Sequence, residues 1–167
     1  MPDEAASFSR PGTLENLPAF IDFVGEACRR AGADPSSCLA LRLAVEEVCV
    51  NLMRHGYAGR EPGPIEMDVR AEPRRLVVTI TDFAPPFFPE SAPAPDLSSG
   101  WKERPLGGLG WHLVKTAVDQ VRYESGASTG NRLTLVKNIE PKHKEEPHGN
   151  HGPRIGLGDD RRDPRKH

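Results

Sequence analysis

The most informative part of the sequence is the stretch Glu47-Val48-Cys49-Val50-Asn51-Leu52-Met53-Arg54-His55. Because Glu47, Asn51 and His55 are spaced by four, they share one face of a predicted helix. This polar row borders an apolar stripe formed by Leu41, Val45, Val48 and Leu52. A small domain normally places only core residues there. The row therefore indicates the wall of a site, and a solvated helix face is the plainer alternative for an isolated match of this kind.

Two further elements precede the row. Residues 7–10 predict a short first strand, and apolar residues at three- and four-residue steps predict a helix that ends at Gly32. Asp34 and Pro35 then give an N-cap followed by proline at the first helical position. The second helix is expected to run from there to about His55.

After this helix the apolar period changes from 3.6 to 2. Residues 65–71 and 76–82 alternate as two half-buried strands. The same alternation turns Asp82 toward the inner face, where an unpaired carboxylate is costly. A third helix follows residues 107–110, and two more strands cover residues 121–123 and 133–135. The residues of this helix expected to face the core are Leu109, Leu113, Val114 and Ala117.

Two segments lack the pattern of a packed structure. Residues 85–105 are rich in proline and poor in apolar residues, which predicts a long loop of the kind that forms a lid or stays disordered. Residues 141–167 contain only two strongly apolar residues, Ile155 and Leu157, and predict a disordered tail. We therefore expect one domain over residues 1–140 and a tail over residues 141–167.

Length and composition exclude several classes of protein. A chain of 167 residues with 37% apolar residues and a net charge of −2 is typical of a globular domain, and it lacks the basic patch of a nucleic-acid binder. No run approaches the roughly 20 apolar residues of a membrane span, and the acidic N-terminus resembles no signal peptide. A cytoplasmic location is expected. Cys28, Cys38 and Cys49 are odd in number and lack metal-ligand spacing, so they predict buried reduced thiols.

Asn51, Asp82 and the run Gly107-Gly108-Leu109-Gly110 each have a use beside a nucleotide. An amide oxygen ligates magnesium, and an inward carboxylate accepts a hydrogen bond from an adenine amino group. Glycines before a helix let backbone N–H groups approach phosphates. The glycine run alone is a weak signal. Its order after the helix, the strand and the long loop makes the combination specific.

In this order the motifs resemble the ATPase superfamily of gyrase, MutL and the histidine kinases. Within it, the chain is similar to the bacterial anti-sigma factor serine kinases of the RsbW and SpoIIAB type, over roughly residues 7–139. The matching segments are residues 47–57, 82–87, 107–114 and 130–135. The resemblance implies a two-layer α/β sandwich in which helices cover one face of a mixed, mostly antiparallel sheet.

The resemblance also implies roles for residues around bound ATP. Asn51 would ligate Mg²⁺, Asp82 would bind adenine, and Glu47 would be the general base on a serine hydroxyl. The competing carboxylate, Glu46, projects about 100° away around the helix. The remaining nucleotide-binding residues implied by the family are His55, Ala84, Phe87, Gly107, Gly108, Leu109 and Gly110.

Two positions depart from the family pattern. Ala84 stands where relatives have a glycine two residues after the aspartate, and Pro86 stands where many have a second glycine. A methyl group at residue 84 is compatible with the nucleotide site if φ is negative and incompatible if φ is positive.

Three functions remain open. The first is a serine kinase that phosphorylates a STAS-type anti-anti-sigma factor and otherwise sequesters a sigma factor. The resemblance also leaves open that the protein is a homodimer, as relatives often are. The second is a non-catalytic protein-binding module of the same fold with weak or no nucleotide binding. The third, a detached histidine-kinase catalytic domain, is less favoured because no phosphoacceptor helix precedes the matching segments.

Overall fold

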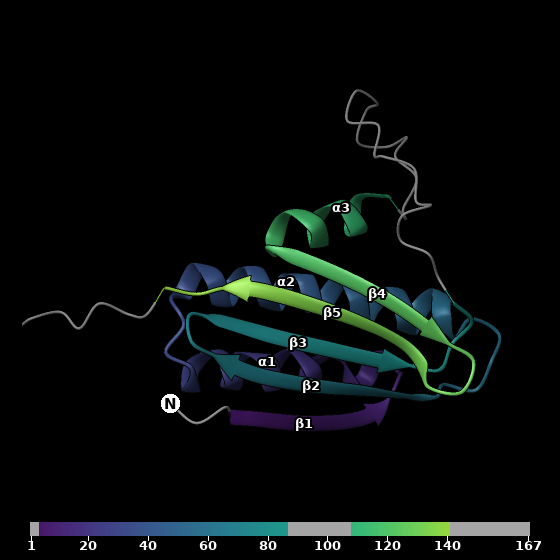
Figure 1. The fold of residues 1–167 in the computed structure, drawn as a ribbon. Helices are drawn as coiled ribbons and strands as arrows, with labels where there is room; N and C mark the ends of the chain where they lie inside the picture. Colours follow the sequence, from purple (N-terminus) through teal and green to yellow (C-terminus); the bar gives the residue numbers. More distant parts are fainter. Residues whose placement is uncertain (1–3, 87–107, 141–167) are drawn as a thin grey trace, which may run out of the picture.

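Period-two stretches of the sequence become the strands of one sheet, and period-3.6 stretches become the helices behind it (Figure 1). The computed structural model describes residues 4–86 and 108–140. The elements in chain order are β1 (Glu4–Pro11), the 3-10 turn η1 (Leu14–Asn16), α1 (Leu17–Arg30), α2 (Pro35–Asn51), the π-helical turn η2 (Leu52–Gly56), β2 (Pro64–Glu72), β3 (Arg75–Asp82), α3 (Gly108–Ala117), β4 (Gln120–Gly126) and β5 (Gly130–Asn138). The expected α/β sandwich is confirmed.

The sheet has the strand order β1-β2-β3-β5-β4 (Figure 1). The prediction of a mixed sheet is wrong for these strands, because each neighbouring pair is antiparallel. The reason lies in β5. The chain passes from β3 through α3 to β4, which runs parallel to β3, but β5 then inserts between them and is antiparallel to both.

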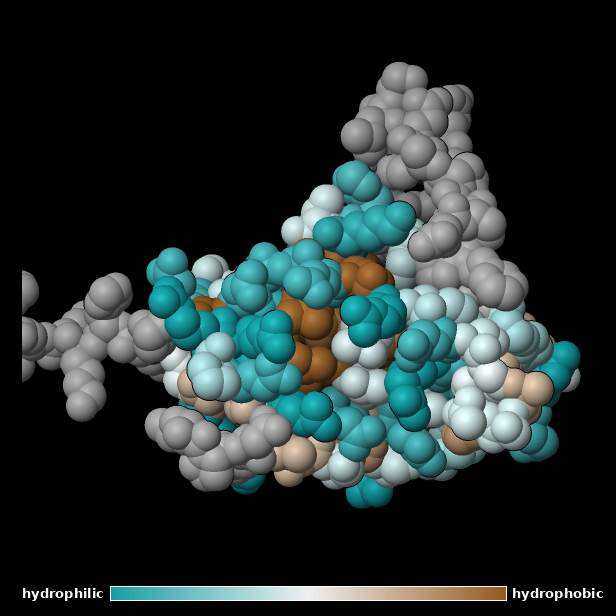
Figure 2. All heavy atoms as spheres, in the orientation of Figure 1, coloured by the Kyte–Doolittle hydropathy of each residue, from teal (hydrophilic) through white to brown (hydrophobic). Residues whose placement is uncertain are grey.

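Alternation along the strands gives the sheet one apolar and one largely polar face. Figure 2 presents the outer face, which is mostly hydrophilic with a narrow apolar strip near its middle. On this face the register of β3 and β5 places Val77 opposite Val136, and both are half-buried. The predicted inner residues Leu76, Val78 and Ile80 are buried on the other face.

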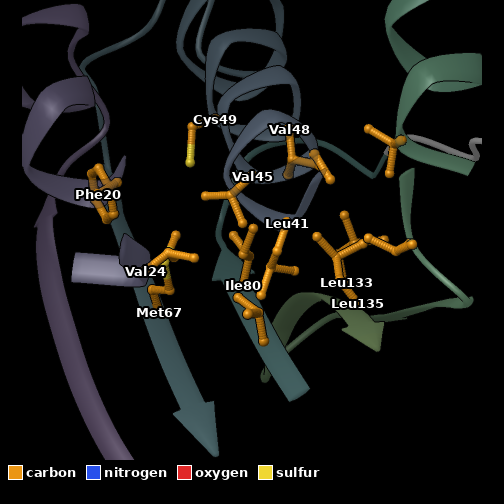
Figure 3. Close-up of a cluster of buried hydrophobic side chains, with 14 of the residues drawn as sticks. Phe20, Val24, Leu41, Val45, Val48, Cys49, Met67, Ile80, Leu133 and Leu135 are labelled. Atoms are coloured by element: carbon orange, nitrogen blue, oxygen red, sulfur yellow. The ribbon is translucent and has the colours of Figure 1, made fainter. Parts of the chain in front are cut away.

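The core lies between this inner face and the helices (Figure 3). Fully buried side chains from α1 and α2 meet those of β2, β3 and β5, and each such aliphatic side chain contributes about 2 kcal/mol by leaving water. The residues labelled in the figure are Phe20, Val24, Leu41, Val45, Val48, Cys49, Met67, Ile80, Leu133 and Leu135. The prediction for α3 is correct in part: Val114 is buried, while Leu113 and Ala117 are half-buried. Trp111 is also buried, and so is Val118, just after the helix.

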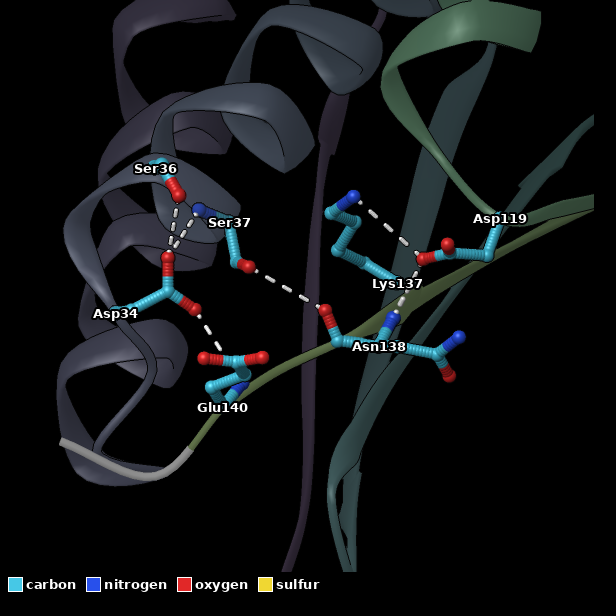
Figure 4. Close-up of polar contacts among 7 residues, drawn as sticks. All are labelled: Asp34, Ser36, Ser37, Asp119, Lys137, Asn138 and Glu140. Carbon is cyan, nitrogen blue, oxygen red and sulfur yellow. Dashed lines mark hydrogen bonds and ion pairs between the residues drawn. The ribbon is translucent and has the colours of Figure 1, made fainter. Parts of the chain in front are cut away.

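The predicted N-cap of α2 is confirmed, and the same residue fastens the end of β5 (Figure 4). Asp34 Oδ1 accepts hydrogen bonds from Ser37 N at 2.8 Å and from Ser36 Oγ at 2.6 Å. Its Oδ2 accepts from Glu140 N at 3.3 Å, and Ser37 Oγ donates to Asn138 O. These donors hold the pKa of Asp34 well below its ordinary value. Residues 34–37 and 138–140 are thereby joined.

The C-terminal end of α2 differs from the prediction of one continuous helix to His55. The α-helix ends at Asn51, and Leu52–Gly56 form a π-helical turn in which Tyr57 N donates to Leu52 O at 3.0 Å. A π turn is wider than an α turn and often occurs near functional sites. Here it accompanies the burial of Tyr57, which is 6% exposed.

Of the long loop expected over residues 85–105, residues 87–105 lie outside the described residues, as does the expected tail at residues 141–167, so the lid and the tail stay predictions. Among the helices that the structure does describe, none is long and apolar enough to span a membrane.

Candidate functional site

A cavity of about 480 Å³ lies between the C-terminal end of α2, α3 and the ends of β3, β4 and β5. Its lining residues are Val48, Asn51, Leu52, His55, Gly56, Ile80, Asp82, Pro85, Pro86, Trp111, Tyr123, Asn131 and Leu133. Figure 3 shows three of the apolar ones, Val48, Ile80 and Leu133, between α2 and the sheet. An apolar cavity with a few convergent polar groups is the usual form of a small-molecule site.

A larger, open groove of about 630 Å³ lies at the opposite end of α2, beside Asp34 and Glu140. Both carboxylate oxygens of Asp34 already accept hydrogen bonds from neighbouring residues there. None of the predicted site residues lines this groove. The smaller cavity, which Asn51, His55 and Asp82 all line, is therefore the candidate site.

Asp82 is a buried carboxylate at the end of β3, 5% exposed, as the alternation predicted. Its Oδ1 accepts two hydrogen bonds at 2.9 Å, one from Ala84 N and one from Asn131 Nδ2. Burial raises the pKa of Asp82, and these two donors counteract part of that rise. Within the described part of the chain no donor reaches Oδ2, so one oxygen of a cavity-lining carboxylate is available to a ligand.

Asn131 fixes this carboxylate, and it is a residue whose role the sequence did not reveal. It is 4% exposed, and register pairs it with Asp82 across β3 and β5. Its Nδ2 also donates to Ala84 O at 2.8 Å, while its Oδ1 accepts from Ser125 Oγ at 2.9 Å. Since both amide donors and the amide oxygen have partners, Asn131 holds Asp82 and the backbone at residue 84 in one arrangement. The pairing of a buried Asp and Asn depends on strand register, which alternation alone does not give.

Ala84 fits this arrangement without backbone strain. Among the described residues that carry a side chain, only Arg74 has a positive φ. The φ of Ala84 is therefore not positive, which is the condition under which its methyl group is compatible with a nucleotide site. Its methyl group is buried beside the π turn, where a Cβ added to Gly56 would lie 3.2 Å from Ala84 Cβ. Glycine at residue 56 therefore provides the space that alanine at residue 84 occupies.

Tyr57 stabilises the backbone just after β3, where it bridges residue 83 and the start of β2. Its hydroxyl donates to Pro64 O at 3.1 Å and accepts from Phe83 N at 3.2 Å. Burial raises the pKa of Tyr57, so the hydroxyl stays protonated. Tyr57 thus holds the backbone that follows Asp82.

Glu47 and Asn51 meet the first turn of α3 at the other side of the cavity. A Cβ on Gly110 would lie 2.5 Å from Glu47 Oε2 and 3.7 Å from Asn51 Nδ2, so only glycine allows this approach without displacing the carboxylate. Asn51 lines the cavity, while Glu47 lies at its margin and is half-buried. Glu46, the competing carboxylate, is exposed.

The remaining predicted residues fall in three groups. His55 lines the cavity from the π turn and is exposed. Gly108 and Leu109 belong to the first turn of α3, and nothing is described of the Leu109 side chain. Phe87 and Gly107 lie outside the described residues. Trp111 is buried and also lines the cavity.

The donor set suits an adenine nucleotide with magnesium. Asp82 offers a carboxylate oxygen for an amino group, and apolar side chains line the cavity beside it. At the other side, a glycine cradle at the N-terminal turn of α3 suits phosphate, and the Asn51 amide offers an oxygen of the kind Mg²⁺ prefers. Asn51, Asp82 and Gly110 therefore lie around the cavity where a nucleotide site would need them. Their roles in binding stay predictions.

Comparisons with known proteins agree with this fold. A serine-protein kinase RsbW from Listeria monocytogenes serovar 1/2a is 28% identical over 123 residues, covering 70% of this chain and 76% of the relative. An anti-sigma F factor from Clostridium novyi is 22% identical over 100 residues, covering 60% and 70%. A crystal structure of the RsbU and RsbW domains of a Mycobacterium tuberculosis protein matches with a TM-score of 0.58 at 19% identity. That match covers 83% of this chain and 33% of the longer protein, and it shows a common fold.

The sequence profile of one domain family covers most of the chain, from residue 11 to residue 137. This range includes each of the cavity-lining residues described above. The predicted resemblance to RsbW-type ATPases is thereby confirmed, and the chain belongs to the histidine kinase-like ATPase domain family.

Proposed function

We propose that this protein is a magnesium- and ATP-dependent serine kinase that phosphorylates an anti-anti-sigma protein and, when it does not, sequesters a sigma factor. Relatives named serine-protein kinase RsbW and anti-sigma F factor support this proposal. Because a sigma factor and an anti-anti-sigma protein act in the cytoplasm, a cytoplasmic location is part of the proposal. Assembly as a homodimer is part of the proposal and is tested by the mass of the purified protein in solution.

One observation carries the proposal. Glu47 and Asn51 lie one turn apart on α2 and meet the glycine turn of α3 at Gly110. Asp82 lines the same cavity, and its Oδ2 has no donor among the residues that the structure describes. A site that only held a nucleotide would have no need for a carboxylate beside the phosphate-binding turn. A kinase requires an acceptor for the proton of the attacking hydroxyl.

The proposed mechanism assigns one task to each of these residues. Asp82 accepts a hydrogen bond from the adenine amino group, with Asn131 holding the carboxylate in place. Asn51 supplies a protein ligand to magnesium, which is commonly shared between one or two side chains and the phosphates of the substrate. Magnesium held there would neutralise charge that develops during phosphoryl transfer. Glu47 accepts the proton of the incoming serine hydroxyl and returns it to water after transfer.

The test combines binding and transfer on matched variants. Titration calorimetry measures ATP binding with and without Mg²⁺ for the wild type and for Asn51→Ala, in which magnesium-dependent binding should be lost. Transfer of labelled phosphate to the cognate anti-anti-sigma protein is then measured for Glu47→Gln. General-base catalysis contributes roughly 10²–10⁴-fold, so this variant should lose at least 100-fold in rate while it still binds ATP.

Glu46→Gln is the control, because Glu46 is a neighbouring carboxylate that is exposed and points elsewhere. It should transfer phosphate at the wild-type rate. Wild-type rates in Glu47→Gln would remove Glu47 from the proposal. A wild-type protein that binds its partners equally well with and without ATP, and transfers no phosphate, would instead be the non-catalytic binding module, for which the Ala84 and Pro86 replacements are the motivation.

A further inference from the structure

The row of α2 that carries Glu47 continues toward the N-terminal end of the helix as two exposed leucines. Leu43 and Leu39 precede Glu47 at four-residue steps, so they lie about 6 and 12 Å from it along the helix axis. Leu39 is 58% exposed and Leu43 is 38% exposed. A single exposed leucine is common on a protein surface, but two neighbours on one row form an apolar patch. This patch leads directly to the proposed catalytic residue.

The nucleotide cavity takes the opposite side of Glu47. The residues of α2 and η2 that line the cavity all follow Glu47 in the sequence, and they are Val48, Asn51, Leu52, His55 and Gly56. A protein that brings a serine hydroxyl to Glu47 while nucleotide fills the cavity therefore has to lie over other surface. Along this row of α2, the surface beside Glu47 that the cavity leaves open is the part with Leu43 and Leu39.

Arg42 adds an unpaired positive charge to the patch. It lies within about 100° of both leucines around the helix, and it faces Gly25 of α1, where an added Cβ would lie 3.6 Å from Arg42 Cδ and Nε. The side chain is half-buried, and its Nε has no hydrogen-bond partner. Within residues 4–86 and 108–140 it forms no ion pair, not even with Glu46 one turn further along α2. A partly buried cation without a counter-ion is unfavourable, and a carboxylate on a bound protein would supply one.

We propose that Leu39, Leu43 and Arg42 form the docking site for the protein whose serine is phosphorylated, an inference that rests on the kinase function proposed above. The partner presents an apolar side chain to the two leucines and a carboxylate to Arg42. Both groups lie about 6–12 Å from the serine that is held at Glu47. Docking on this side of Glu47 leaves the cavity free for the nucleotide.

Steady-state kinetics on the full chain test this docking site. Leu39→Gln and Leu43→Gln keep side chains of similar size and good helix propensity but remove the apolar contact. Each should raise KM for the phosphoacceptor protein at least about tenfold, the loss expected when an apolar anchor leaves an interface. Since only binding of the protein substrate is affected, kcat and KM for ATP should keep their wild-type values.

The charge at Arg42 is tested in the same assay. Arg42→Gln should raise KM for the phosphoacceptor protein several-fold and make it less sensitive to salt, because an attraction between opposite charges is lost. Arg42→Lys should restore part of the loss. A wild-type KM with wild-type salt dependence in Arg42→Gln would remove Arg42 from the docking site.

Leu14→Gln is the matched control, because Leu14 is 48% exposed and lies outside α2. It should leave both KM values unchanged. Wild-type KM values in both α2 leucine variants, or an equal rise in Leu14→Gln, would overturn the docking site. A change in the solution mass of the α2 leucine variants without a change in KM would assign the patch to contact between two copies of this chain, which would overturn it as well.

Direct binding separates this inference from the proposed function. Calorimetry in the presence of Mg-ATP measures the affinity for a phosphoacceptor protein whose target serine is replaced by alanine, so no transfer is needed. Binding by the wild type that weakens at least about tenfold in the α2 leucine variants supports the docking site. Equal binding by the wild type and these variants overturns the docking site alone. A wild type that neither binds nor phosphorylates this partner overturns the proposed function, and the docking site with it.

Discussion

At the scale of single residues, Asp82 is a buried carboxylate whose ionised form lowers the stability of the fold. Its raised pKa means that the folded protein binds the proton more tightly than the unfolded chain does. Stability therefore falls as pH rises from the ordinary value of 3.8 through the raised value, because over that range only the folded state keeps the proton. An ionised Asp82 is thus unfavourable for folding at neutral pH, which is consistent with the role in ligand binding proposed above.

Asp82→Asn separates these two effects. The amide keeps an oxygen in the place of Oδ1, so Asn131 and Ala84 can still donate to it. We expect the variant to be at least as stable as the wild type at pH 7 and to lose at least about tenfold in ATP affinity, since one charge-assisted hydrogen bond is worth about 1.5–3 kcal/mol. Urea unfolding at a series of pH values should show the stability difference growing in favour of the variant as pH rises above 3.8. A uniform loss of stability would contradict this account.

Asn131 is the residue that keeps Asp82 in one orientation. In Asn131→Ala, Asp82 loses one donor and Ala84 O loses its partner inside a buried site, which should lower the free energy of unfolding by about 2–3 kcal/mol. The affinity for ATP should fall as well. Ser125→Ala removes only the hydrogen bond to Asn131 Oδ1, so it should cost less in both measurements. Equal losses in the two variants would mean that Asn131 holds the β4–β5 turn rather than Asp82.

At the scale of elements, the π turn η2 and the segment after β3 are matched in size. Gly56→Ala would press a methyl group against Ala84 Cβ at 3.2 Å, and such overpacking costs about 1–3 kcal/mol. Ala84→Gly should relieve that contact. In a double-mutant cycle measured by chemical denaturation, the two changes should therefore cost less together than the sum of their separate effects. Additive losses would show that residues 56 and 84 do not press on each other.

The same element shows where sequence reasoning succeeds and where it stops. The spacing of Asn51 and the alternation that ends at Asp82 are local patterns, and both residues line the cavity as predicted. The π turn was not predicted, because an i+5 hydrogen bond changes the course of the helix without changing its apolar residues. The sign of φ at Ala84 also could not be predicted, because the local sequence is compatible with either sign.

At the scale of the whole molecule, sheet order and buried polar pairs are what the sequence left undetermined. The strands themselves follow from alternation, but the insertion of β5 between β3 and β4 depends on long-range packing. That insertion is what brings Asn131 beside Asp82 from a distant part of the sequence. Trp111 faces inward because the start of α3 sets which residues meet the sheet, and a start within a glycine run is not fixed by periodicity.

The cavity is built from both halves of the chain, so a nucleotide should stabilise them together. α2, η2 and β3 come before the long central segment, and α3, β4 and β5 come after it. A ligand at 100 times its dissociation constant adds about 2.7 kcal/mol to the stability of the folded state. We expect Mg-ATP to raise the melting temperature of the wild type clearly, and to raise that of Asp82→Asn by at most about half as much at the same concentration, because a tenfold weaker affinity leaves the ligand at about 10 times its dissociation constant.

Hydrogen exchange can locate this effect. With Mg-ATP, amide protection should increase together at the C-terminal end of α2, at residues 83–84 and near Asn131, since all three regions border the cavity. The first strand, β1, lies at the far edge of the sheet and should change only to the extent that global stability does. Protection confined to one half of the chain would mean that the two sides bind the nucleotide separately, and the single site formed by Asn51, Asp82 and Gly110 would then have to be abandoned.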